Sequence, residues 1–407
     1  MEQALEEDMP LVFVHGVTTR SGPDYDKEVL IRNALFRHFA LTALAPDPAD
    51  VQIFNTYWGD EGAKFLWHHA SLPKEAGLEA FGPADETAAL ILSTFFGNQP
   101  PERDTMLVQI ARNSMDDVVD LLWLVSSFLV EDGTNEAEKA DALATLAAST
   151  KRYILENPRP LWLATVYNDQ QFLSRLIYEV NEWMESKHHQ TFADPFWELL
   201  RGARVELVNR VTGIRQQAER ILSVFSRATL HQRLALFLGD VFVYLHQGST
   251  PDQPGGIVSS VLADLDCARA RQQESEHDKN LVVVAHSMGG NIMYDILTHY
   301  RPNLHVDVFV TVGSQIAVFE ELKLFGASDQ TIPNPKQPRV SKPSNVDHWL
   351  NVFDLNDFLG FATEGVFVDS KDFAFLTGGG LIAAHSKYFT LPSFHQRLEA
   401  RLREISL

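Results

Sequence analysis

The stretch Leu281–Asn291, LVVVAHSMGGN, decides how this chain folds. Its first four residues form an apolar run that predicts a short buried strand, and the residues after the serine predict the start of a helix. Ser287 stands alone at the apex between them. In such a sharp turn the residues two before and two after the apex come close together, so both must be small. Ala285 and Gly289 meet this requirement, which indicates a strand, a tight turn and a helix at this point.

Ser287 is therefore the candidate nucleophile. A serine at the apex of this turn has strained backbone angles that expose its hydroxyl. The amide of Met288, where the helix begins, is a natural donor to an oxyanion. A second donor is expected in the turn after an early strand, and here the amide of Val17 follows the pair His15-Gly16. Gly16 allows the backbone to approach closely, whereas His15 is expected to hold the loop. The alternative is a strand–Gly–Gly–helix turn with an incidental serine.

An activated serine needs a general base, and the base needs an orienting carboxylate. Where a nucleophile occupies this kind of turn, the order along the chain is Ser, then Asp or Glu, then His. The histidines that follow the serine are His299, His305, His348, His385 and His395. We favour His385, because it follows the last candidate strand and the glycines at 378–380, so a loop can bring its imidazole over the serine.

The orienting carboxylate is expected after the apolar strand at 348–353. Asp354 and Asp357 both follow it. We favour Asp357, because a few turn residues after the strand end let its carboxylate reach the histidine. Asp354 lies nearer the strand and is expected to fix the turn through backbone amides. Asp369 and Asp372 come later and are weaker candidates.

Short apolar runs at 10–14 and 51–57 predict two early strands of a buried parallel sheet. From 61 to 237 strand signals almost disappear and apolar residues recur at helical spacing. The helices expected there cover residues 86–96, 106–130, 135–156, 171–187 and 195–225.

Alternation of strands and helices resumes near residue 238 with the apolar segment 238–245. Further strands are expected at 281–284, 305–312, 348–353 and 365–368, and helices at 257–273, 290–300, 381–388 and 392–405. A polar, proline-bearing loop is expected at 325–347. The pattern indicates an α/β fold with a doubly wound, mostly parallel sheet and a large all-helical insertion between its early and central strands. We expect a catalytic domain at 1–60 and 238–407 and a helical insertion at 61–237.

Composition narrows the classes of partner. The chain has 407 residues and a formal net charge of -20, so nucleic acid and anionic membrane surfaces are poor partners. Its only cysteine, Cys267, permits neither an intramolecular disulfide nor a cysteine-based zinc site. We expect a cytoplasmic protein, because no signal peptide precedes the first strand and the longest apolar run, 118–130, is too short for a bilayer. His188-His189 lacks accompanying ligands, so no metal is expected.

These motifs together resemble the lipase and serine-esterase branch of the α/β-hydrolase superfamily, including lipases of the GPI inositol-deacylase-like and DDHD-like types. The similar segments are FVHG at 13–16, YWGD at 57–60, GDVFVYL at 239–245, VVVAHSMGG at 282–290, FVTVGSQIA at 309–317, WLNVFDLNDFLG at 349–360 and AHSKYF at 384–389. The resemblance implies Ser287, Asp357 and His385 as a catalytic triad. It covers about 1–60 and 238–407, so it implies nothing about the insertion.

The expected reaction is hydrolysis of a carboxylic ester, from a small molecule or a lipid, through an acyl-enzyme on Ser287 and without a cofactor. A thioesterase or acyltransferase would use the same residues. A non-catalytic binding module that kept the fold is the alternative of another class. The apolar helices of the insertion favour a lid over an acyl pocket. The alternative is a surface for a protein partner or for oligomerisation.

Overall fold

The computed structural model describes residues 10–67, 105–128, 136–188, 227–247, 250–274, 280–378 and 383–405. Its centre is a six-stranded sheet with the order β2-β1-β3-β4-β6-β8, in which every pairing is parallel. The strands are β1 (Leu11–Val14), β2 (Ile53–Thr56), β3 (Val282–His286), β4 (Val306–Val312), β6 (Val346–Phe353) and β8 (Ser370–Ala374). The prediction of an α/β fold with a mostly parallel sheet is confirmed.

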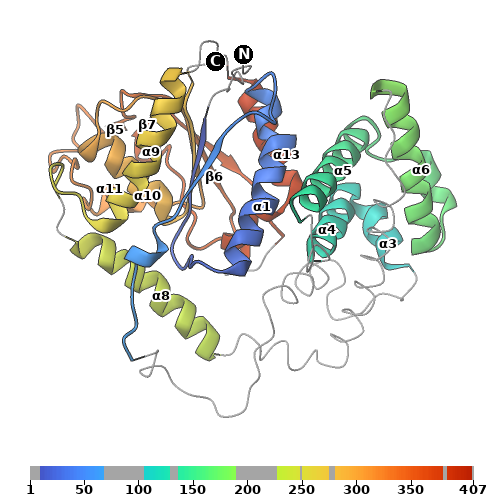
Figure 1. The fold of residues 1–407 in the computed structure, drawn as a ribbon, viewed down its shortest axis with the longest axis horizontal. Helices are drawn as coiled ribbons and strands as arrows, with labels where there is room; N and C mark the ends of the chain where they lie inside the picture. Colours follow the sequence, from blue (N-terminus) through green and yellow to red (C-terminus); the bar gives the residue numbers. More distant parts are fainter. Residues whose placement is uncertain are drawn as a thin grey trace, which may run out of the picture.

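Helices cover both faces of the sheet (Figure 1). Side chains alternate between the faces along each strand, so Val283 packs on one side and Val282 on the other. The first face lies under α9 (Gly256–Glu274), α10 (Met288–Asp295) and α11 (Ile316–Glu321), and the second lies under α1 (Pro23–His38) and α13 (Pro392–Arg403). The central strands are buried on both faces, which explains their nearly continuous apolar sequences.

The described helices between β2 and β3 form a second apolar core. They are α3 (Met106–Asn113), α4 (Met115–Phe128), α5 (Glu136–Glu156) and α6 (Asp169–His188), and a further helix, α8 (Arg227–His246), follows. The helix expected at 106–130 is interrupted at Ser114, which is extended and whose hydroxyl accepts a hydrogen bond from the Asp117 amide at 3.2 Å. The helices expected at 86–96 and 195–225 lie outside the described residues.

Of these helices, α5 lies beside α1 and α13, and α4 lies beside α13 (Figure 1). Leu35 of α1 and Phe39, directly after it, share an apolar cluster with Leu143 of α5. Polar contacts also join α5, α4 and α13. The fully buried ammonium of Lys151 contacts the carboxylates of Asp116 and Asp120 at 2.9 and 3.1 Å. The Asp120 carboxylate in turn accepts hydrogen bonds from the amide and hydroxyl of Ser393, in the first turn of α13. The described part of the insertion is thus anchored to the flank of the α/β unit.

Several expected elements differ from those observed. The apolar segment 238–245 is not a strand, because it forms the end of α8. The expected domain boundary at residue 238 therefore falls within a helix. The expected strand at 365–368 is reduced to β7 (Phe367–Val368), which pairs with β5 (Val340–Ser341) in a separate two-stranded sheet. The last strand of the main sheet is β8, which sequence patterning did not predict, and α1 was not predicted either.

No helix in the described ranges combines the length and the apolar content that a bilayer-spanning segment requires.

Two buried histidines predict an acid-sensitive fold. Burial lowers the pKa of both His15 and His395 from 6.5 to about 4. Between these values the unfolded chain binds protons that the folded chain does not, so stability falls as the pH drops from 6.5 to about 4. Each histidine contributes about 1.4 kcal/mol per pH unit in this window.

His395→Gln tests this expectation. The imidazole of His395 contacts the Phe389 carbonyl through Nε2 at 3.0 Å, and a glutamine keeps a donor without titrating. In urea unfolding at pH 7 and pH 5, the variant should lose less unfolding free energy on acidification than the parent. The difference should be about 1.4 kcal/mol per pH unit below 6.5, the contribution of one histidine. Equal losses in the two proteins would contradict the assignment.

Candidate active site

The order of the strands changes direction between β1 and β3, which makes this the switch point of the sheet. The chain leaves β1 toward β2 on one side and later returns to β3 on the other. Ligands of open parallel sheets bind beyond the carboxyl ends of the strands at such a switch point. Gly16 follows β1 there and Ser287 follows β3.

Ser287 occupies a strained turn. Its φ and ψ are 52° and −127°, a region that residues other than glycine seldom adopt. The turn is held from outside, because the Ser287 amide donates to the Val312 carbonyl at 2.9 Å and the Ser314 hydroxyl donates to the Ser287 carbonyl at 3.1 Å. Neighbouring glycines are required by space. A Cβ at Gly16 would lie 2.7 Å from the Ser287 Cβ, and one at Gly289 would lie 2.5 Å from the Val14 carbonyl oxygen.

Three of the predicted residues form one hydrogen-bonded chain. The Nε2 atom of His385 lies 2.8 Å from the Ser287 hydroxyl. The Nδ1 atom of the same ring lies 2.9 Å from Oδ2 and 3.1 Å from Oδ1 of Asp357. The serine is fully buried, and the imidazole is 14% exposed. In the neutral ring, Nδ1–H donates to the carboxylate and Nε2 is left to accept the serine proton.

Asp357 is held as a carboxylate. Burial by itself raises its pKa, but the hydrogen bond and charge of His385 and the hydrogen bonds from the Leu359 amide and the Tyr388 hydroxyl outweigh it, so the pKa is lowered overall. The Leu359 amide donates to Oδ1 and the Tyr388 hydroxyl donates to Oδ2, both at 2.9 Å. The acid therefore remains charged and oriented toward the imidazole.

Asp354 fills a different role. Its carboxylate accepts hydrogen bonds from the amide and hydroxyl of Thr377 at 2.7 Å and from the amide of Asn356 at 2.8 Å. These contacts fasten the end of β6 to the segment after β8. The geometry matches the expectation that Asp354 fixes the turn, and it places Asp357 next to the histidine.

The loop after β1 is pinned by its histidine. His15 is buried and stacks on the Trp58 ring at 4.8 Å between centroids. The Trp58 amide donates to Nε2 of His15 at 3.0 Å, and the Trp58 indole donates to the His15 carbonyl at 2.9 Å. The neutral imidazole, whose pKa is lowered to about 4 by burial, donates through Nδ1 to the Gly16 carbonyl. Val17 follows Gly16 on this loop, and Met288 begins α10 directly after the serine.

Three residues of the site escaped the sequence patterns. Tyr388 bridges the two aspartates, since its hydroxyl donates to Asp357 and accepts from the Asp354 amide at 2.8 Å. The His286 ring contacts the His385 carbonyl through Nε2 at 2.8 Å, and burial lowers the pKa of His286 to about 3. Asp240, fully buried on α8, accepts the Thr18 amide at 2.8 Å beside the Val17 loop. The sequence offered one indication of the role of Asp240, which is that it is a single acidic residue within the apolar run 238–245.

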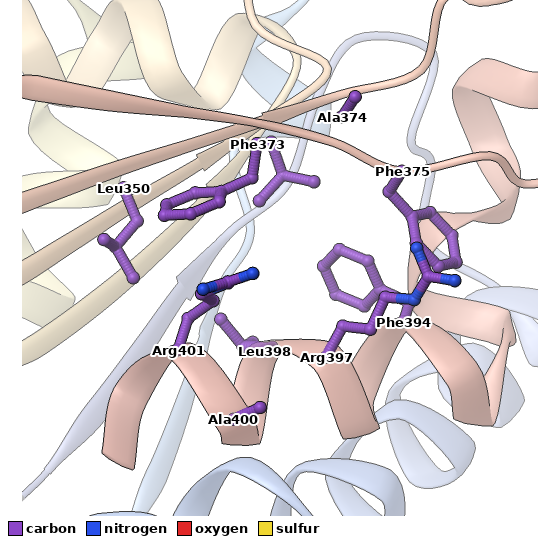
Figure 2. Close-up of a pocket in the computed structure, with 10 residues that line it drawn as sticks. Leu350, Phe373, Ala374, Phe375, Phe394, Arg397, Leu398, Ala400 and Arg401 are labelled. Atoms are coloured by element: carbon purple, nitrogen blue, oxygen red, sulfur yellow. The ribbon is translucent and has the colours of Figure 1, made fainter. Parts of the chain in front are cut away.

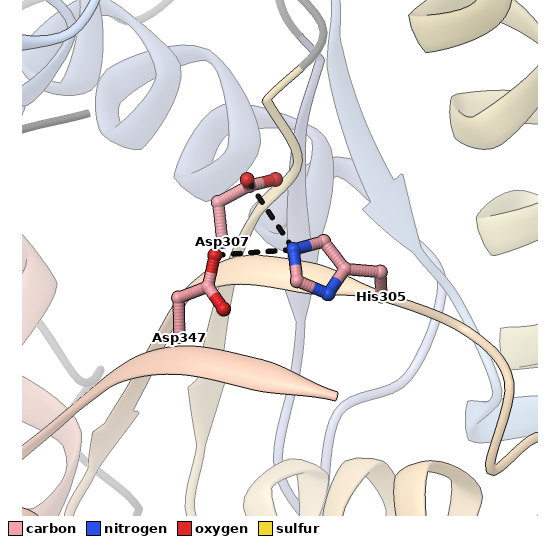
Figure 3. Close-up of side chains that lie close together, drawn as sticks. All are labelled: His305, Asp307 and Asp347. Carbon is pink, nitrogen blue, oxygen red and sulfur yellow. Dashed lines mark hydrogen bonds and ion pairs between the residues drawn. The ribbon is translucent and has the colours of Figure 1, made fainter. Parts of the chain in front are cut away.

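A group of metal-binding side chain types lies elsewhere. His305, Asp307 and Asp347 gather at the amino ends of β4 and β6, away from the serine (Figure 3). The His305 Nε2 atom lies 3.1 Å from the Asp347 carboxylate and 3.6 Å from that of Asp307. His305 and Asp347 are half-exposed, and the imidazole contacts both carboxylates, so the three side chains interact with one another directly. Of the pair His188-His189, the first ends α6 and the second lies outside the described residues.

No protein-family model matches this chain, and the searches of curated proteins and of solved structures find no significant similarity.

Tyr388→Phe is expected to weaken the candidate site without unfolding the chain. The substitution removes one charge-assisted hydrogen bond to Asp357 and one acceptor for the Asp354 amide, while the buried ring is kept. We expect the rate of fluorophosphonate labelling to fall roughly tenfold. Rates measured across pH 5–9 should show the larger loss at low pH, because the Tyr388 hydrogen bond helps to lower the pKa of Asp357 and its loss lets the carboxylate take up a proton at a higher pH. An unchanged rate and profile would show that Tyr388 only fills space.

Proposed function

We propose that this chain is a serine hydrolase of the α/β-hydrolase fold that cleaves a carboxylic ester with an apolar acyl group. The observation that carries the proposal is the continuous hydrogen-bonded chain from the Ser287 hydroxyl through His385 to the buried Asp357. A nucleophile on a strained strand-to-helix turn, a neutral imidazole and an ionised acid are the parts that acyl transfer requires.

The geometry supports the following sequence of steps. The Ser287 oxygen attacks the ester carbonyl while Nε2 of His385 accepts its proton. The amides of Val17 and Met288 hold the negative oxygen of the tetrahedral intermediate. The imidazolium then protonates the departing alcohol, which leaves the acyl group on Ser287. Water, deprotonated by His385, attacks the acyl-enzyme and releases the acid. Asp357 keeps Nδ1–H in place and stabilises the imidazolium.

The preference for an apolar acyl group rests on side chains around the acid. Leu355 and Phe358 flank Asp357 and are 76% and 50% exposed, and Leu376 precedes Thr377 and is 64% exposed. Exposed apolar residues gathered at a polar site favour an apolar ligand. Thioesters and acyl acceptors other than water could react through the same three residues. The acyl-enzyme on Ser287 is common to all of these reactions, and the experiment below distinguishes between the substrates.

The test is labelling of intact protein with a fluorophosphonate probe, followed by a panel of p-nitrophenyl esters and acyl thioesters from two to sixteen carbons. We expect stoichiometric labelling on Ser287 and the highest kcat/KM with medium or long acyl esters. Faster turnover of thioesters would replace the esterase by a thioesterase. Absence of labelling would favour a non-catalytic binding module.

A further inference from the structure

A cleft opens beside the edge strand of the sheet, apart from Ser287. It has a volume of about 130 Å³ and lies between α13 and the adjoining strands β6 and β8 (Figure 2). Its apolar wall comprises Leu350, Val352, Phe373, Phe375, Phe394 and Leu398. The cleft therefore offers apolar surface on the α13 side of the sheet.

The size of the cleft limits what it accepts. An apolar cavity of roughly 150 Å³ lined by aliphatic and aromatic side chains accommodates a benzene ring. A cleft of about 130 Å³ with a similar lining therefore takes a ring or an alkyl segment of roughly six carbons. A longer chain would have to emerge at the open side.

Two arginines of α13 stand at this opening. Figure 2 shows the side chains of Arg397 and Arg401 directed from the helix toward the strands. The Arg397 guanidinium lies 5.3 Å from the Phe375 ring centroid, and that of Arg401 lies 4.7 Å from the Phe373 centroid. Arg401 also pairs with the exposed Glu404 at 2.9 Å. Within the described ranges, Arg397 has no carboxylate at ion-pair distance.

Two cations beside an apolar cleft favour an anionic ligand that also has an apolar part. A guanidinium binds a carboxylate through parallel N–H donors. We propose that this cleft is a binding site for an apolar monocarboxylate, whose alkyl or aryl end enters the cleft and whose carboxylate binds Arg397 and Arg401. The site does not depend on the proposed hydrolase function, because none of its lining residues belongs to the serine site.

Octanoate binding, measured by titration calorimetry on the full chain, tests the proposal. Arg397→Gln/Arg401→Gln removes the cations, and Ala400→Trp fills the cleft from α13. Both changes affect exposed helix positions. The arginine variant is expected to weaken binding roughly tenfold, since each of the two partly exposed charge pairs contributes a few-fold. Ala400→Trp should weaken it to a similar extent, roughly tenfold, because the larger side chain takes up space that the alkyl end needs. Octanamide should bind the parent roughly tenfold more weakly than octanoate, and the arginine variant should not weaken it further.

Arg403→Gln is the matched control, because Arg403 lies on the same helix, pairs with Glu399 and does not line the cleft. It should bind octanoate as the parent does. Failure of the parent to bind octanoate would overturn the proposal. Binding that survives both the arginine and the Ala400→Trp changes would also overturn it, because the carboxylate would then occupy another place, such as the acyl pocket of the proposed hydrolase.

Discussion

Ser287→Ala is expected to abolish fluorophosphonate labelling and to lower ester hydrolysis by about 10⁴- to 10⁶-fold. The change removes the only atom at the apex that can form the covalent bond, and the alanine methyl group leaves the hydrogen-bonded pair of His385 and Asp357 in place. Since alanine tolerates the apex backbone (φ 52°) no worse than serine does, the melting temperature should stay close to that of the parent. The measurement is gel-based labelling beside a thermal melt.

Ser386→Ala is the matched control. Ser386 is an exposed serine adjacent to the base, and its replacement should leave labelling intact. His385→Ala should strongly reduce labelling while Ser287 is retained, because the hydroxyl loses its proton acceptor. Labelling that persists in Ser287→Ala would place the nucleophile elsewhere in the chain and would contradict the proposed function.

Asp357→Asn should have the second largest effect, a fall in kcat of about 10³- to 10⁴-fold. An asparagine can present its NH₂ to the imidazole and thereby stabilise the tautomer in which Nδ1 is the acceptor. Nε2 then carries the proton and cannot accept one from the serine. The imidazolium formed during attack would also lose its charged partner. Initial rates on the best ester, at pH values from 6 to 9, measure the loss.

Asp354→Asn separates the two acids. Its carboxylate holds Thr377 and Asn356, so we expect a loss of roughly 1–2 kcal/mol in unfolding free energy and labelling within tenfold of the parent. The opposite pattern, with stability lost in Asp357→Asn and activity lost in Asp354→Asn, would make Asp354 the orienting acid.

The elements that were predicted well are those whose sequence pattern is compatible with only one local structure. The β3 strand begins with an apolar run, and the turn at Ser287 requires a small residue at Gly289, where a Cβ would lie 2.5 Å from the Val14 carbonyl oxygen. His385 was favoured from chain order and from its place after the last candidate strand and the glycines at 378–380, and its Nε2 atom lies 2.8 Å from the Ser287 hydroxyl.

The elements that were missed have patterns that tertiary contacts override. The edge strand β8, SKDFA, is mostly polar, because its Asp372 accepts the amides of Thr363 and Glu364 instead of facing solvent. The helix α1 carries Arg32, whose buried guanidinium reaches Asn55 at 2.8 Å and covers the Phe13 ring. The apolar segment 238–245 is helical, with Asp240 turned inward to hold the loop after β1.

The anchoring of α4 and α5 has a consequence for protein engineering. The insertion cannot be removed without loss. Leu35 of α1 and the following Phe39 would become exposed to solvent, and Ser393 would lose its hydrogen bonds to the Asp120 carboxylate. A shortened chain that joins β2 directly to α9 would expose this apolar surface, and we expect it to self-associate. Grafting the insertion onto another scaffold would in turn deprive the Asp120 carboxylate of the Ser393 hydroxyl and leave it with the ammonium of Lys151.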